Sequence, residues 1–168
     1  MFVENKDEFE LLSPPVSRRK ARETALQGLY ALELSGNSLY SVISLVLGKD
    51  VEDNTITRFT KLLIRQTFEQ RELLDEYIRN HSKNWKFERI AIIDRIIMRI
   101  AISEFINFVD IPPKVSIDEA IELSKLYSTD KSGGFINGIL DAVYEHLKKE
   151  NKIQKTGRGC LDNEDIHV

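Results

Sequence analysis

The chain has 168 residues, of which 42% are hydrophobic and 30% charged, a composition that predicts one globular domain with a real core. Its net charge of −3 excludes a positive field over the whole surface, so any nucleic-acid site must be a local patch. The single cysteine, Cys160, cannot form an internal disulfide, and no stretch is long and apolar enough to cross a membrane. The acidic start of the chain lacks an apolar run of signal-peptide type. We therefore expect a cytoplasmic protein.

In chain order, a flexible acidic leader is expected over residues 1–15, ending at a pair of prolines that break helices. Helices are predicted over residues 17–35, with Ser17 as the N-cap, and over residues 39–47, because a glycine follows each of them. Residues 55–81 should form one long helix or two kinked ones, because their apolar side chains recur every three or four residues.

The most apolar stretch, residues 89–107, is predicted to be the central helix of the fold. At 3.6 residues per turn its apolar side chains go nearly all the way round, so other helices must cover it. Its narrow polar stripe recurs every fourth residue and consists of Arg95, Arg99, Ser103 and Asn107. The predicted fold class is therefore all-α, a single-domain bundle of about six to seven helices around this element.

Two carboxylates, Asp94 and Glu104, lie among the apolar residues of this helix, and a buried carboxylate needs a partner. One interpretation is a structural ion pair with an arginine. The other is that one of the two carboxylates faces a bound partner. They lie about 15 Å apart along the helix axis, which is too far for a single acid–base site.

Sequence signals also mark the two ends of the central helix. Trp85 and Phe87, just before it, are expected to pack as core anchors. After it, the stretch from Ser116 to Glu119 has the spacing of a capping box, which predicts that the next helix starts there.

The last part of the chain is predicted to be one turn, one helix and a tail. Residues 128–134 should form the turn, and residues 135–149 the last helix. Residues 150–168 are polar and are expected to fray. The folded domain is thus predicted over residues 16–149.

No sequence feature indicates catalysis. The three histidines, His81, His146 and His167, are predicted to be isolated from one another and from Cys160, without metal-ligand spacing. No motif identifies a nucleophile with its base and orienting acid, and no glycine-rich phosphate loop follows a predicted strand. We expect no enzyme activity, no metal and no cofactor.

The strongest functional signal is the basic cluster, defined as Arg18, Arg19, Lys20 and Arg22, at the start of the first helix. Positive charge disfavours that end of a helix, whose dipole is already positive, so the cluster indicates another use. Phosphates are suitable ligands, because helix N-terminal amides and arginines both favour anions. Tyr30 follows along the same edge, where a base could stack on it. The alternative is a solvated basic face paired with the acidic leader.

Three motifs in order carry a family resemblance: SRRKARETALQGLY, WKFERIAIIDRIIMRIAISE and IPPKVSIDEAIELSKLYSTDKSGGFINGILD. Together they resemble the NusB family of bacterial transcription antitermination factors, over about residues 17–147. The resemblance implies an all-helical adaptor without catalytic activity. It implies binding to the boxA sequence of nascent RNA together with a small-subunit ribosomal protein, NusE, in the antitermination complex of RNA polymerase.

The resemblance also implies roles for matching residues. Those expected to contact RNA are Arg18, Arg19, Lys20, Arg22, Gln27, Tyr30, Lys131 and Phe135. Those expected to contact the ribosomal protein are Asp94, Arg95 and Arg99, which favours the partner-facing interpretation of Asp94. The chain departs from the family pattern at Gly133 and Gly134, where a basic or polar side chain is usual. Lys131 could supply the missing charge.

Two other functions stay open at this point. One is the NusB-like accessory domain of an rRNA methyltransferase, although the chain shows no glycine motif of a cofactor-binding domain. The other is a purely protein-binding helical adaptor, for which neutralising the basic cluster would leave RNA retention unchanged. The sequence also leaves open whether the protein is a monomer or a homodimer.

Overall fold

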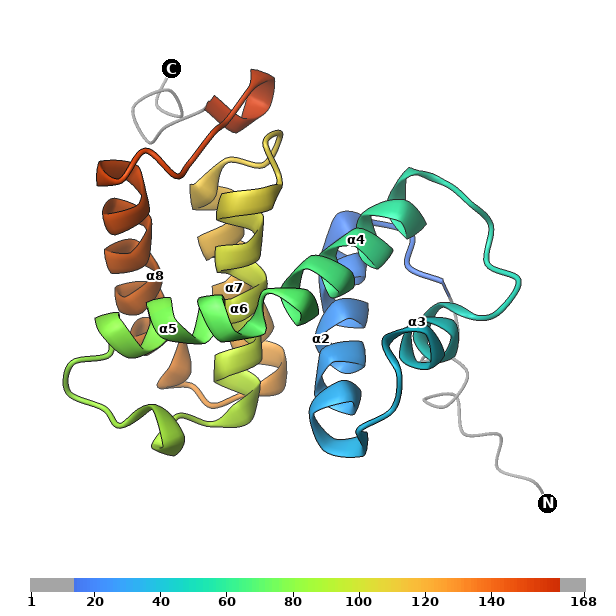
Figure 1. Cartoon of the computed structure of the whole chain (residues 1–168), viewed down its shortest axis with the longest axis horizontal. Helices are drawn as coiled ribbons and strands as arrows, with labels where there is room; N and C mark the ends of the chain where they lie inside the picture. The colour runs from blue at the N-terminus through green and yellow to red at the C-terminus, as the bar shows by residue number, and fades with distance from the viewer. Residues whose placement is uncertain (1–13, 161–168) are drawn as a thin grey trace. The chain divides into compact units, whose positions relative to one another are not determined.

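The computed structural model describes residues 14–160, which form seven α-helices and two short 3-10 helices, with no strand among them (Figure 1). The all-α class and the expected number of helices are confirmed over these residues. The predicted leader lies almost wholly outside them. The chain divides into two compact units, residues 1–65 and residues 66–168, here called unit 1 and unit 2. Their boundary falls within one helix, α4 (Thr55–Glu69).

Unit 1 contains α2 (Arg18–Ser35), α3 (Leu39–Leu47) and the first part of α4. The hydroxyl of Ser17 accepts a hydrogen bond from the backbone N–H of Lys20 at 3.1 Å, which is the expected N-cap. Gly36 ends α2 in the left-handed conformation, with φ of 64°, as its place after the apolar pattern predicts. The predicted bounds of α2 and α3 are thus confirmed.

Unit 2 contains α5 (Arg71–His81), α6 (Ile92–Asn107), α7 (Pro113–Tyr127) and α8 (Ser132–Lys149). Helix α6 lies in the middle and packs against the other three (Figure 1). Every residue from Ile96 to Phe105 is buried, so the central role predicted for this helix is confirmed. Within residues 14–160, no helix meets the length and apolarity that a membrane crossing requires.

Helix α6 begins at Ile92, three residues later than predicted, because Phe87–Arg89 form a separate 3-10 helix and Ile90 is extended. Its polar stripe is largely covered, since Arg99 and Ser103 are buried and Arg95 and Asn107 are half-buried. The guanidinium of Arg99 donates two hydrogen bonds to the carboxylate of Asp75 in α5, from Nε at 2.6 Å and from Nη2 at 2.9 Å. Asn107 exchanges hydrogen bonds with Gln70. The stripe therefore carries the buried polar contacts of α6 with the segment that starts α5.

Helices α7 and α8 both start earlier than predicted. Pro113 occupies the first turn of α7, where its fixed φ suits a helix and its missing N–H costs nothing. Ser116 therefore lies one turn inside α7, 1% exposed, and its hydroxyl has no hydrogen-bond partner. The capping box prediction is wrong. Helix α8 begins at Ser132, so Gly133 and Gly134 are helical instead of forming the predicted turn.

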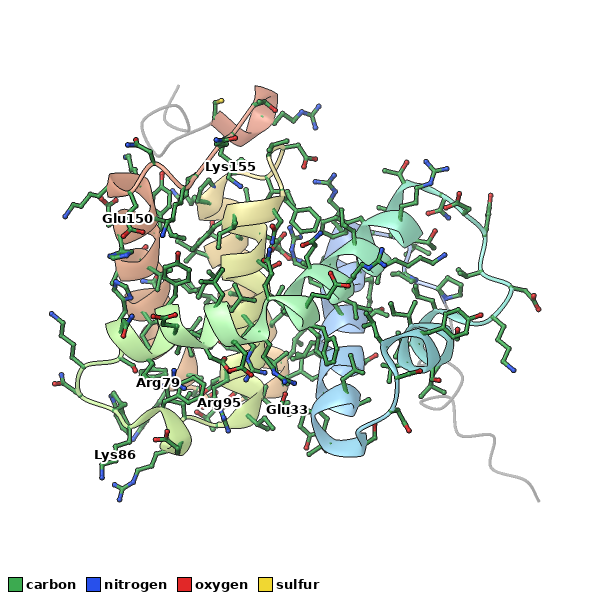
Figure 2. All side chains as sticks on the ribbon, in the orientation of Figure 1. Glu33, Arg79, Lys86, Arg95, Glu150 and Lys155 are labelled. Carbon is green, nitrogen blue, oxygen red and sulfur yellow. The ribbon has the colours of Figure 1, made fainter. Side chains whose placement is uncertain are left out.

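Residues 150–160 are held in place, so the predicted fraying is wrong for this part of the tail. The Nζ of Lys155 donates hydrogen bonds to the backbone oxygens of Glu104 at 3.0 Å and Phe108 at 2.7 Å, at the C-terminal end of α6 (Figure 2). Gly159 packs so closely on the carbonyl of Val109 that a side chain would clash there. Burial lowers the pKa of Lys155 to about 8.

Candidate nucleic-acid interface

The basic cluster lies at the start of α2 and is divided between packing and solvent. Arg22 is only 4% exposed and Arg18 is half-buried, whereas Arg19 and Lys20 are exposed. The guanidinium carbons of Arg18 and Arg22 lie 4.8 and 5.6 Å from the ring centre of Phe59 on α4, within cation–π range. Two members of the cluster thus hold α2 against α4, and the other two lie on the exposed side of the helix.

The start of α2 combines the basic cluster with the positive end of the helix dipole. The first turn of α2 contains no acidic residue, so the helix dipole and the side-chain charges add. Lys20 pairs with Glu23 at 3.1 Å one turn later. Gln27 and Tyr30, the other residues of α2 expected to contact RNA, are half-buried in the following turns. The six predicted residues of unit 1 therefore all belong to a single helix.

The two predicted RNA contacts of unit 2, Lys131 and Phe135, belong to α8 and the residue that precedes it. They line a cavity of about 310 Å³ with Trp85 and Arg89. Trp85 is 59% exposed, so its predicted role as a core anchor is wrong, whereas Phe87 is buried as predicted. The Trp85 and Phe135 rings meet edge to face, with centroids 5.7 Å apart.

Sequence reasoning missed Trp85 and Arg89 as candidate binding residues. A signal for Trp85 was present in its neighbours, because Lys83, Asn84 and Lys86 give that stretch the polar composition of a surface segment. No comparable sequence signal marks Arg89, because the apolar pattern places it within the predicted central helix.

Asp94 is buried, but its hydrogen-bond partners are hydroxyls. Its carboxylate accepts hydrogen bonds from Ser128 at 2.6 Å and from Ser132 at 3.0 Å. The buried arginine ion pair that was considered for Asp94 is made instead by Asp75 and Arg99. The carboxylate of Asp94 therefore fixes the turn between α7 and α8, which is where the aromatic cavity lies.

The three residues predicted to contact a protein partner have different environments. Arg99 is 5% exposed and bonded to Asp75, so it holds α6 to α5 and does not present its charge at the surface. The guanidinium carbon of Arg95 lies 5.1 Å from the ring centre of Phe87, and that of Arg79 lies 4.6 Å from the same centre. Figure 2 shows Arg79 and Arg95 near each other, at the opposite end of unit 2 from Lys155.

Two of the histidines are not isolated, contrary to the prediction. The rings of His81 and His146 lie 5.0 Å apart, and the Nε2 of His146 lies 3.3 Å from a carboxylate oxygen of Glu150. Even so, no group of three or more metal-ligand side chains occurs between residues 14 and 160. His167 lies outside the described residues.

Comparison with known proteins identifies the family. The model of the NusB family matches residues 19–145, most of the chain. The chain belongs to the NusB family. It is 44% identical over 148 residues to the transcription antitermination protein NusB of Chloroherpeton thalassium, covering 88% of this chain and 70% of the relative.

Solved structures of the NusB family have the same fold. The structure of Thermotoga maritima NusB matches with a TM-score of 0.72 and 30% identity, over 84% of this chain and 98% of that one. A structure of the antitermination factors NusB and NusE in complex with double-stranded RNA matches with a TM-score of 0.63 and 25% identity. That match covers 77% of this chain and 96% of the other.

Proposed function

We propose that this chain is a transcription antitermination factor that binds boxA-type single-stranded RNA together with the ribosomal protein NusE, without catalysis. The observation that carries the proposal is the divided basic cluster, in which Phe59 and two arginines fix α2 while Arg19 and Lys20 remain exposed. Membership of the NusB family and the related NusB–NusE complex with RNA support the choice of ligand and partner.

Affinity for RNA comes from charge at the start of α2. Arg19 and Lys20 neutralise phosphates and release counterions, so binding should fall steeply as salt rises. The positive end of the helix dipole at the start of α2 adds to the same attraction. Preference for unpaired RNA comes from aromatic side chains, since bases that are not paired can stack on Tyr30 and Phe135. Lys131 adds a charge beside Phe135.

The protein partner is assigned to the surface around Arg95. Arg95 and Arg79 flank the buried ring of Phe87, which limits their freedom and lowers the entropy cost of ordering them on binding. Asp94 and Arg99 support this surface from inside, through the turn before α8 and through α5 respectively. Simultaneous contact with RNA and NusE would raise the affinity for both, which suits assembly on RNA polymerase.

The test is a titration of a labelled boxA-like RNA at two salt concentrations, with and without NusE. Replacing both Arg19 and Lys20 by alanine should weaken binding and reduce the slope of log affinity against log salt by about 1.4, at roughly 0.7 per phosphate contact. Lys125→Ala is the matched control, because Lys20 and Lys125 are 60% and 63% exposed and each pairs with a glutamate three residues away. Unchanged RNA binding by the double variant in the presence of NusE would overturn the proposal.

A further inference from the structure

A groove in unit 1 lies between α3 and the first part of α4, here called the α3–α4 groove (Figure 1). Its volume is about 580 Å³, within the range of binding sites, roughly 300–1,000 Å³. Residues spaced three or four apart share one face of a helix. With that spacing, one face of each helix lines the groove: Tyr40, Ile43 and Leu47 on α3, and Arg58, Lys61 and Arg65 on α4.

The α3 wall of the groove is more apolar than its packing within unit 1 requires. Seven of the nine residues of α3 have apolar side chains, but only Val42 and Leu47 are buried. Tyr40 is 81% exposed, and Leu62 of α4, which lines the same groove, is 43% exposed. Covering large apolar side chains such as these stabilises a protein. The groove therefore offers apolar surface to another segment of chain.

The α4 wall and the loop after α3 make the groove cationic. Twelve described residues line it; four of them are Lys49, Arg58, Lys61 and Arg65, and none is acidic. Arg58 pairs with Asp53 at 2.9 Å, and both side chains are exposed. Surfaces that bind each other carry complementary charge. The segment that fits this groove should therefore be both apolar and acidic.

The first thirteen residues of the chain, which lie outside the described residues, have this composition. They read MFVENKDEFELLS, with six apolar side chains and four carboxylates against one lysine. From Glu8 to Leu11, acidic and apolar residues alternate. The basic cluster at the start of α2 would attract the same carboxylates, but the groove combines cations with an uncovered apolar wall. The groove is therefore the better match for this segment.

Residues 1–13 are also long enough to reach the groove. They join the rest of unit 1 at Pro14, and the groove belongs to the same unit. Thirteen residues span up to about 43 Å when extended, at roughly 3.3 Å per residue. The 18 residues of α2 span about 27 Å at 1.5 Å per residue. Because a tethered segment has an effective concentration on the order of 1 mM, weak contacts suffice to hold it.

We propose that the α3–α4 groove is the docking site of residues 1–13 of the same chain. The apolar side chains of this segment cover Tyr40, Ile43 and Leu62, and its carboxylates face Lys49 and Lys61. A nucleic-acid strand fits less well, because half of the lining residues have apolar side chains. The inference goes beyond the proposed function and does not depend on RNA binding.

A spin label on the segment tests the proposal in the full chain. Cys160→Ser removes the one cysteine, and Asn5→Cys then carries the label without changing a charged or apolar residue of the segment. The NMR methyl signals of Leu39 and Ile43 in α3 should broaden, and more strongly than the signal of Ala21 at the start of α2. Stronger broadening at Ala21, or none at either place, would overturn the proposal.

Charge reversal tests the polar part of the contact. Lys49→Glu with Lys61→Glu should remove most of the broadening in α3, because like charges then face each other. Adding Glu8→Lys with Glu10→Lys to this variant should restore the broadening. A loss without such a rescue would contradict the charge pairing on which the proposal stands.

Lys83→Glu with Lys86→Glu is the matched control, because it changes the net charge equally at two exposed lysines of unit 2. The broadening in α3 should persist in this control, and an equal loss there would overturn the assignment to the groove. Melting curves show whether each variant is folded.

Two further measurements distinguish other occupants of the groove. A spin-labelled chain is mixed with an isotopically labelled chain that carries no spin label. Broadening in that mixture as strong as within one chain would mean that a second copy supplies the segment, and the proposal would be wrong. If the Lys49 and Lys61 double variant keeps the broadening but loses binding of a boxA-like RNA, the groove is an RNA surface and the proposal also fails. Neither result alters the expected role of Arg19 and Lys20.

Discussion

The start of α2 and the cavity beside α8 illustrate two kinds of site. Four cations within five residues at the start of a helix are visible in the sequence, because everything that defines the basic cluster is local. The cavity depends on Trp85 and Phe135 meeting across unit 2, and on a turn fixed by Asp94. Local charge can thus be assigned from the sequence, whereas a pocket assembled from distant segments requires the fold.

The largest effect should come from breaking the ion pair between Asp75 and Arg99, which is assembled in the same way as the cavity. Asp75→Ala leaves a buried guanidinium without its carboxylate, and should cost about 3–5 kcal/mol of unfolding free energy. Chemical denaturation measures it. Replacing both partners by apolar residues of similar size should recover much of the loss. A single variant that costs less than about 1 kcal/mol would show that the pair is not a main support of unit 2.

A smaller effect should distinguish the packing residues of the basic cluster from its RNA-binding residues. Arg22→Ala removes a 4% exposed side chain that packs on the ring of Phe59, and should destabilise the protein by about 1–2 kcal/mol. Arg19→Ala, on the same helix but exposed, should leave stability within about 0.5 kcal/mol and instead lower the RNA affinity. Denaturation curves of the two variants decide the matter. Equal stabilities would contradict the division into packing and binding residues.

The sequence predicted helices better than it predicted their environment. Period and glycine signals were enough for α2 and α3, because those signals are local. Trp85 was misjudged because its apolar ring predicts burial, whereas the fold places it at a cavity. The tail was misjudged because polar composition says nothing about Lys155, which reaches two backbone oxygens at the end of α6.

The contact of Lys155 with the end of α6 can be tested by the pH dependence of stability. The pKa of Lys155 is about 8 in the folded chain, against 10.5 when it is unperturbed, because burial disfavours the charged amine. Between about pH 8 and pH 10.5 the unfolded chain binds more protons at this site, so its contribution to stability should rise with pH. Below about pH 8 the amine is charged in both states, and the contribution should not change.

The measurement is the difference in unfolding free energy between the natural chain and Lys155→Met, followed from pH 7 to pH 10.5. Taking the difference removes the titration of all other groups. The unfolding free energy of the natural chain should increase relative to that of the variant as pH rises. The increase should be smaller than the full pKa shift would give, because Lys155 remains partly exposed and solvent screens its charge. A difference that is flat above pH 8, or that falls, would mean that the Lys155 amine is not desolvated at the end of α6.

The smallest effect should come from Ser116, where a local sequence signal was misleading. If Ser116 capped α7, its replacement by alanine would cost about 1 kcal/mol. In the structure Pro113 starts the helix, and the Ser116 hydroxyl is buried without a hydrogen-bond partner. Ser116→Ala removes an unsatisfied polar group and changes little volume, so stability should stay the same or rise by up to about 1 kcal/mol. Denaturation measures the sign, and a loss of about 1 kcal/mol would favour the helix start that the sequence pattern indicated. The sign of the stability change therefore tells whether Pro113 or Ser116 determines where α7 begins. It also tests whether a local capping pattern outweighs the packing of the folded chain.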